Sequence, residues 1–571
     1  MSKKQVPTMA DRFHAWRAGK CAAATGFVGQ PEPRSIGSYN KGRQIVAGNL
    51  MFAGELIEAP DTSLWDIEMP SADFSSEAHG FLWLDDLAAA GDAKARDLAG
   101  HWLSEWITKY PAPSLPAWSP EVTGRRVIRW VNNALFILRG SGADISDDYY
   151  TSLSKQTEFL ARRWRVLPSG LSRFEALVGI IYAGLTIEGM QHHVDPAMKA
   201  LASDCDAHID AQGAIVSRNP EELLDVLTHL TWVQKACAAV GREPATAISN
   251  AVERIGPTLR ALRHADGGLT RFHGGGRGVD GKLDQALADA ASRMARTGDT
   301  AMGFARLNGG RTSLIIDASP PPVTTNARRA HASTLAMELT SGRRPLIVNC
   351  GAGVSFGDRW ARAGRATPSH SVLHLEGQSS AQLNDEGHLV GGPQTVQLDI
   401  QRTAENQKLG AAHDAWAGSH GLTHVRELEL SADGRVLNGS DMLTTMNDAD
   451  KNRFDLALDA TSLQGIAYSV RFHLHAEVDA SLDMAGRAVS LVLRSGEIWV
   501  FRAIEGVQLS LEPSVYLEKG RIAPRATMQI VLSGKAVAYA SQVKWSLSKA
   551  QDTPLAVRDL FDSGDARDWN D

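Results

Sequence analysis

The chain has 571 residues, a length that allows about three or four domains. Hydrophobic residues make up 43% and charged residues 22% of it, which is ordinary for a globular protein with a large core. The formal net charge of −6 provides no basic field for nucleic acid. A run of about 18 apolar residues, the length of a membrane-spanning helix, does not occur.

The amino-terminal segment starts with two lysines, and charged residues at positions 11, 12, 17 and 20 interrupt its apolar residues. Secretory signals need a continuous apolar stretch, so we expect a cytoplasmic protein, with the periplasm or cell envelope as the alternative. The four cysteines, Cys21, Cys205, Cys237 and Cys350, form no CxxC motif. Neither a disulfide framework nor a zinc knuckle is predicted.

Up to about residue 295 the apolar residues recur at helical spacing, and Gly, Pro and Asp clusters separate the runs. No alternating strand pattern competes there, so this half is predicted to be an all-helical array. The predicted helical runs are 79–110, 124–140, 173–190, 221–241 and 247–264.

After about residue 300 the apolar period changes to two. Short runs rich in Val, Ile and Leu are separated by turn sequences such as SADGR and RSGE, a pattern typical of stacked antiparallel sheets. The predicted strand runs are 312–320, 344–351, 395–402, 424–430, 468–478, 488–502, 507–513 and 526–534.

Several stretches occur in a collinear order along these two halves. They include HGFLWL (79–84), SRFEALVGIIYAGL (172–185), RNPEELL (218–224), HADGGLTRFHGGG (264–276), AHASTLAMEL (330–339), LIVNCG (346–351) and TPSHSV (367–372). This order resembles the heparinase II/III family of polysaccharide lyases. The resemblance implies an N-terminal extension (1–30), an incomplete (α/α) toroid (31–298), an antiparallel β-sandwich domain (299–555) and a C-terminal tail (556–571).

The active residues of that family are largely replaced. The resemblance implies an Asn-His pair where this chain has Leu171 and Ser172, while the acidic residue three positions further on is kept as Glu175. Glu222 stands where a catalytic tyrosine is expected. In the β-domain the family motif His-x-His-x-Asp reads RAHAS, starting at Arg329.

Elimination from a uronic-acid polymer needs a group that neutralises the carboxylate, a base and an acid. The replacements remove candidates for all three roles, so the resemblance gives a nominal polysaccharide lyase that acts on or binds an anionic polysaccharide or oligosaccharide. One alternative is a non-catalytic saccharide-binding or scaffold protein on a lyase fold. Another is a glycoside hydrolase that uses Glu175 and Glu222 as its carboxylate pair, although Glu222 also suits a helix N-terminus structurally.

Cations and polar groups near the expected helical cleft are candidate substrate ligands. Arg218 and Asn219 precede a helix start, where backbone N–H groups attract anions. Arg271 and Arg277 flank three glycines that let backbone approach a ligand, and guanidinium groups bind carboxylates in a bidentate way. A simple domain linker is the structural alternative for this glycine-rich loop.

The expected site lies where the helical cleft faces the β-domain. Arg329 stays protonated at any working pH, so we expect it to hold a carboxylate rather than act as a base. His273 is then the expected proton shuttle, because an unperturbed imidazole titrates near neutrality.

The resemblance also implies a structural zinc site in some family members, at positions matched here by His331, Asn349 and His370. An amide oxygen is a poor zinc ligand, so the two histidines are expected to form a structural pair, with or without zinc. The interpretation of Trp83, Trp102, Trp106, Trp118 and Trp130 is core packing rather than a sugar groove. Homo-oligomerisation is left open.

Overall fold

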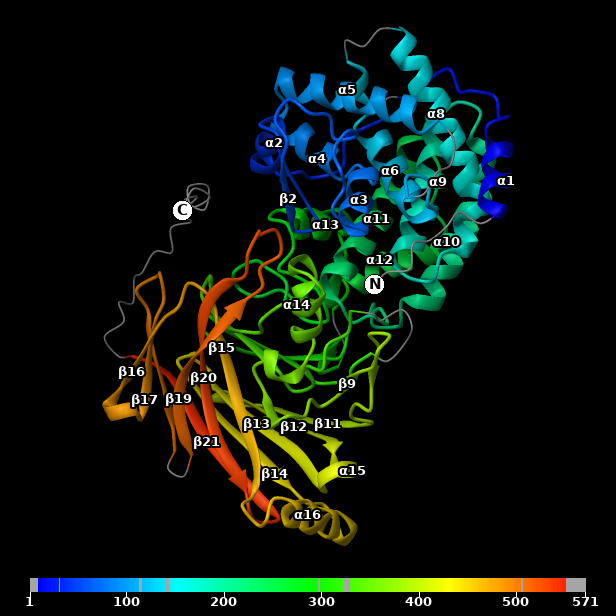
Figure 1. Ribbon diagram of the computed structural model, residues 1–571. Helices are drawn as coiled ribbons and strands as arrows, with labels where there is room; N and C mark the ends of the chain where they lie inside the picture. The colour runs from blue at the N-terminus through cyan, green and yellow to red at the C-terminus, as the bar shows by residue number, and fades with distance from the viewer. Residues whose placement is uncertain are drawn as a thin grey trace.

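The computed structural model describes residues 9–29, 31–111, 116–139, 143–295, 298–322, 329–504 and 507–550. Helices gather in one part of the molecule and β-sheets in the other (Figure 1). The chain passes from the first to the second between α13 (Lys282–Ala290) and β3 (Thr300–Ala301). The predicted order, helices before an antiparallel β-domain, is confirmed.

Besides α13, the helical part contains α1 (Met9–Ala18), α2 (Tyr39–Val46), α3 (Ala72–His79), α4 (Trp83–Ala90), α5 (Ala93–Lys109), α6 (Pro120–Asn132), α7 (Ala134–Leu138), α8 (Ala143–Arg163), α9 (Leu171–Thr186), α10 (Val194–His208), α11 (Pro220–Ala239) and α12 (Thr246–Ala261). The prediction that this half is wholly helical was wrong in one place. A hairpin of β1 (Asn49–Phe52) and β2 (Glu55–Glu58) lies in it, where Ala53 and Gly54 make the turn with positive φ. Among the described helices, none combines the length and apolar character that crossing a bilayer requires.

Local sequence explains where the helices begin and end. The predicted run 79–110 is divided, because Gly91 ends α4 in the left-handed conformation at φ 67°. Asp92 then starts α5, its side chain accepting a hydrogen bond from the Ala95 N–H. In the same way Ser119 caps α6 and Asn219 caps α11, each followed by a proline at the first helical position.

The helical core is aromatic. Trp83, Trp102, Trp106, Trp118 and Trp130 are all at most 3% exposed, which confirms their interpretation as core residues. Trp106 lies between the rings of Trp118 and Trp130, at centroid distances of 6.2 and 5.6 Å. Edge-to-face and offset contacts of this kind add to the stabilisation from buried area.

Two large antiparallel sheets form the β-domain. One has the order β11-β12-β13-β14-β21-β18-β17-β16, and the other the order β19-β20-β15-β7-β6-β5-β4-β3, with β8 also paired to β15. The first comprises β11 (Val396–Arg402), β12 (Asn406–Trp416), β13 (Leu422–Ser431), β14 (Val436–Thr444), β16 (Asp479–Asp483), β17 (Ala488–Val492), β18 (Ile498–Ala503) and β21 (Ala540–Lys549). The second comprises β3, β4 (Phe304–Gly309), β5 (Thr312–Asp317), β6 (Met337–Ser341), β7 (Arg344–Val348), β8 (Leu373–Leu375), β15 (Ile466–Leu474), β19 (Gln508–Tyr516) and β20 (Arg525–Ala536).

The strand order brings distant segments together. The last strand, β21, pairs with both β14 and β18 and so completes the middle of its sheet. Shorter elements decorate the sandwich: a hairpin of β9 (Gln382–Leu383) and β10 (Leu389–Val390), and helices α14 (Asp358–Ala363), α15 (Ala417–His420) and α16 (Asp448–Ala460). Strand β5 is buried along its whole length and ends at Asp317, near the helical part.

Candidate functional site at the domain junction

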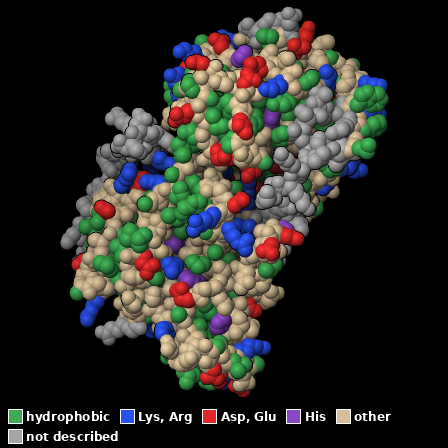
Figure 2. Space-filling view, viewed as in Figure 1, with side chains coloured by type: hydrophobic (Ala, Val, Ile, Leu, Met, Phe, Trp, Pro, Cys, Tyr) green, Lys and Arg blue, Asp and Glu red, His purple; other side chains and the backbone are tan. Residues whose placement is uncertain are grey.

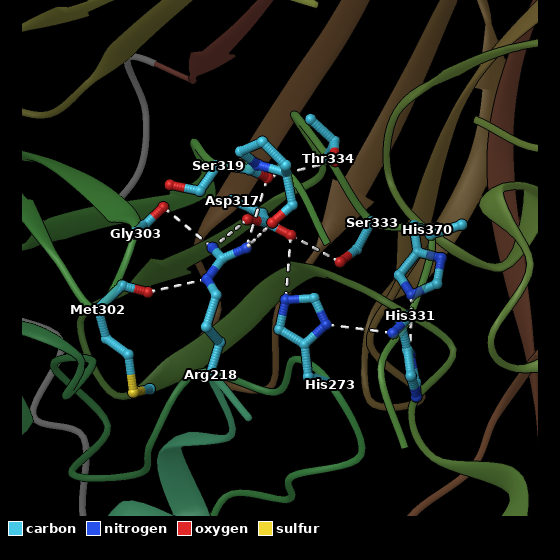
Figure 3. Close-up of polar contacts among 12 residues, drawn as sticks. Arg218, His273, Met302, Gly303, Asp317, Ser319, His331, Ser333, Thr334 and His370 are labelled. Carbon is cyan, nitrogen blue, oxygen red and sulfur yellow. Dashed lines mark hydrogen bonds and ion pairs between the residues drawn. The ribbon is translucent and has the colours of Figure 1, made fainter. Parts of the chain in front are cut away.

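Arg218 joins the helical part to the β-domain. It lies directly before α11 with φ 53° and reaches across the junction (Figure 3). Its guanidinium donates to the carbonyl oxygens of Met302 at 3.0 Å, Gly303 at 3.1 Å and Pro320 at 2.8 Å, and it forms an ion pair with Asp317. The donors of Arg218 are therefore used by the protein itself.

Asp317 is the centre of this junction network, and it is fully buried. One carboxylate oxygen pairs with Arg218, while the other accepts a hydrogen bond from the Ser333 hydroxyl at 2.7 Å and lies 3.3 Å from His273 Nε2. Burial alone would raise the pKa of Asp317, but Arg218, His273 and Ser333 together hold it well below its usual value. The carboxylate is thus ionised at neutral pH.

His273 occupies the space between Asp317 and the β-domain motif. Its Nδ1 accepts a hydrogen bond from the His331 backbone N–H at 3.1 Å, and the residue is 1% exposed. Burial lowers the pKa of His273, an effect that the neighbouring Asp317 opposes. The predicted neighbourhood of His273, Arg218 and His331 therefore exists, but it is enclosed by protein.

His331 and His370 do meet, with His331 Nδ1 3.0 Å from His370 Nε2. The His370 Nδ1 donates to the Ala366 carbonyl at 2.9 Å. Asn349 lies differently, because its carboxamide oxygen accepts the Ser371 backbone N–H at 3.0 Å. Two imidazoles without a carboxylate or thiolate do not complete a tetrahedral zinc site, so no chemistry is assigned to zinc here and the structural zinc stays a prediction.

Arg271 belongs to a second buried group. Its guanidinium nitrogens lie 3.7 Å from carboxylate oxygens of Glu338 and of Asp266, and its backbone N–H donates to Glu338 at 3.0 Å. Burial would lower the pKa of Arg271, but the surrounding anionic groups raise it above its usual value. Like Arg218, this candidate substrate ligand is paired within the protein.

Of the other candidates, Glu175 is buried, Glu222 and Arg277 are partly buried, and Arg329 is exposed. Glu175, at the start of α9, is held by Arg125 Nε at 2.8 Å. Burial raises the pKa of Glu222, and Arg329 opposes that rise. Arg277 lies 3.3 Å from Asp280.

The side chain of Asn219 has a structural role, because it caps helix α11. Its side-chain oxygen accepts the backbone N–H groups of Glu221 and Glu222 at 3.0 and 3.2 Å, which is the geometry of a helix N-cap. Neither Asp317 nor Arg125 was predicted from the sequence patterns. A lone Asp at the end of the apolar run TSLIID was the one available signal for Asp317.

Comparisons with known proteins agree with this architecture. Residues 297–546 match the family model described as "Heparinase II/III-like, C-terminal". The chain is 28% identical over 536 residues to "FtsZ-localized protein C" of Caulobacter vibrioides, a match that covers 91% of this chain and 89% of the relative.

Solved lyase structures share the fold. The crystal structure of heparinase III has a TM-score of 0.67 and 12% identity, covering 95% of this chain and 89% of that one. A mutant of the heparan sulfate lyase HepC from Pedobacter heparinus has a TM-score of 0.59 and 13% identity, covering 95% and 88%. Residues 297–546 therefore form a heparinase II/III-like C-terminal domain, and the chain as a whole has the fold of these lyase structures, a helical toroid followed by an antiparallel β-sandwich.

Proposed function

We propose that this chain is a non-catalytic binding protein on a lyase fold. The observation that supports this is the internal pairing at the junction, where Arg218 and His273 take Asp317 as their partner. An eliminating enzyme needs its base and its carboxylate-neutralising group to face the substrate. Here His273 is 1% and Arg218 9% exposed, so a polymer would have to separate the domains to reach them.

An anionic saccharide is the proposed ligand class. Lys and Arg side chains gather where the helical and β-parts meet on the face shown in Figure 2. Arg329 is exposed, and the side chains of Arg277 and Lys519 are 39% and 62% exposed. Such cations attract carboxylates and sulfates without any proton transfer.

A panel of uronate polymers tests both statements. Product with a C4–C5 double bond absorbs in the ultraviolet, so the expected result is no rise in absorbance together with measurable, salt-sensitive binding. Arg329→Ala should weaken that binding, while Arg359→Ala on α14 serves as a matched surface control. Ultraviolet-absorbing product would overturn the non-catalytic proposal, and absence of binding to every polymer would overturn the ligand class.

A hydrolase is the second candidate, favoured by the carboxylates of the helical part. Inverting and retaining glycosidases need one protonated and one ionised carboxyl group. Burial raises the pKa of Glu222, as an acid requires, whereas Glu175 accepts a hydrogen bond from Arg125 Nε at 2.8 Å. New reducing ends without ultraviolet absorbance, lost in both Glu175→Gln and Glu222→Gln, would establish this alternative.

We further infer that the chain works beside FtsZ, as the name of its Caulobacter relative says of that protein. The support is likeness along nearly the whole chain, since 91% of it is covered. A cytoplasmic location belongs to this proposal. Purified full-length chain should pellet with FtsZ polymers assembled with GTP and stay in the supernatant with unassembled FtsZ. Equal sedimentation with and without polymer would refute the partnership.

A further inference from the structure

A second group of titratable side chains shares no residue with the junction network. Glu158 lies on α8, with its side chain 8% exposed. His192 and His193 form the short 3-10 helix η2 (Gln191–His193) directly before α10. The Nε2 atoms of His193 and His192 lie 2.8 and 3.4 Å from the same carboxylate oxygen, Oε1 of Glu158.

The spacing of these three atoms suits a metal ion. One ligand atom from each residue falls within 4.8 Å of the others. Zinc bonds of about 2.0–2.1 Å in a tetrahedral site place neighbouring ligand atoms roughly 3.3 Å apart. The observed separations of 2.8 and 3.4 Å bracket that value, so small side-chain movements would complete three of the four bonds.

A backbone hydrogen bond determines which ring nitrogen of His192 is free to bind a metal. The Nδ1 of His192 lies 3.1 Å from the Gly189 carbonyl oxygen, which can only accept, so Nδ1 carries the proton. In the neutral ring, Nε2 then presents a lone pair towards the Glu158 carboxylate, an unfavourable contact that a cation between them would relieve. This is the arrangement by which outer hydrogen bonds orient metal-binding histidines.

Glu158 is oriented in the same manner. Arg162 Nη2 lies 2.6 Å from Oε2, the other oxygen of the carboxylate. Oε1 is thereby left to the two imidazoles. A monodentate carboxylate with its second oxygen paired to an arginine matches the outer-shell support found at metal sites.

An open pocket of about 630 Å³ gives solvent access to this group. Its lining includes Trp16, Cys21, Glu158, Arg162 and His192. Cys21 is partly exposed, whereas Cys205, Cys237 and Cys350 are buried. A thiol from the N-terminal segment therefore lines the same pocket as His192 and Glu158, and thiolate is a strong zinc ligand.

We propose that Glu158, His192 and His193 bind a divalent transition-metal ion, for which zinc is the best match. Cys21 is the proposed fourth ligand. The ion would tie η2 to α8, and through Cys21 it would tie the segment after α1 to the same helix. Its role would be to fix the N-terminal segment on the helical part, independently of any chemistry at the domain junction.

Metal uptake by the untagged full-length chain tests the proposal. After chelator treatment and removal of the chelator, we expect one equivalent of Zn²⁺ to bind and Co²⁺ to give the visible absorption of a tetrahedral site. Thiolate ligation should add a near-ultraviolet charge-transfer band that is lost in Cys21→Ser. No uptake would overturn the site, and a Co²⁺ spectrum unchanged by Cys21→Ser would remove the fourth ligand.

Single substitutions assign the ligands. His192→Ala, His193→Ala and Glu158→Gln should each lower Zn²⁺ affinity by more than about 10- to 100-fold, the loss caused by removing an outer-shell partner alone. His101→Ala is the matched control, because the ring of His101 lies 3.3 Å from Glu105 on the exposed side of α5. Affinity equal to the parent in all three variants would overturn the proposal.

Two further measurements test whether Zn²⁺ binds at this site and whether the variants are folded. His370→Ala should leave Zn²⁺ uptake unchanged, which separates this site from the zinc positions implied by the family. Circular dichroism of the metal-free variants should match that of the parent. If Glu158→Gln folds normally and still binds Zn²⁺ with parental affinity, the assignment fails.

Discussion

Asp317→Asn tests whether the buried ion pair holds the helical part against the β-domain. The substitution keeps the size of the side chain but removes the charge that compensates Arg218. Breaking a buried pair by removing one partner costs about 3–5 kcal/mol. Arg218 keeps four carbonyl acceptors in the β-domain, so we expect a loss near the lower limit, about 3 kcal/mol of unfolding free energy.

The measurement is urea unfolding followed by circular dichroism and by tryptophan fluorescence. Two probes are needed because a chain of several domains can unfold in steps. Asp299→Asn is the matched control, since Asp299 and Arg402 form an ion pair of 2.7 Å with side chains 54% and 43% exposed. Exposed pairs contribute at most about 1 kcal/mol, so this variant should stay close to the parent.

A double-mutant cycle sharpens the same test. Arg218→Ala combined with Asp317→Ala should lose less stability than the sum of the two single variants, because each single variant leaves a buried charge without its partner. An Asp317→Asn variant that loses no more than the Asp299→Asn control would refute the reasoning. So would strict additivity in the cycle.

Three other predictions follow from burial and packing. Burial lowers the pKa of His370 to about 4. Because this folded pKa lies below the unfolded value, His370 contributes its full stability above a pH of about 6.5, and that contribution is lost as the pH falls towards 4. The melting temperature should therefore fall across this window. A melting temperature that stays flat would contradict the prediction. Gly124→Ala should lower the free energy of unfolding by about 1–3 kcal/mol, because a Cβ there would lie 2.8 Å from the Ala176 Cα. The control is Gly100→Ala on α5, where a Cβ has open space, and this variant should be neutral or stabilising in thermal melts. A thiol reagent should modify Cys21 first in the native protein, since the other three cysteines are buried; modification of all four at one rate would argue against the packing.

The fold followed largely from local sequence. Apolar spacing of 3.6 marked α9, α11 and α12 within a few residues of their observed ends, and a period of two marked strands such as β5 and β15. The division of 79–110 into α4 and α5 was missed, although Gly91 and Asp92 carried the signal. Helix α8, with its polar start at Ala143, gave no run that the spacing analysis identified.

The site depended on contacts that sequence spacing cannot supply. Residue type and resemblance brought Arg218, His273 and His331 into one region, and they do lie together. What their side chains do was set by Asp317, which lies 99 residues from Arg218 and reaches it only when the β-domain packs against the helical part. A buried guanidinium whose donors are all used by its own protein is not available to a ligand. Tertiary packing decides whether those donors are used, so the sequence by itself determined that Arg218, His273 and His331 gather at the junction, and only the folded chain decided that Asp317 pairs with Arg218 and His273.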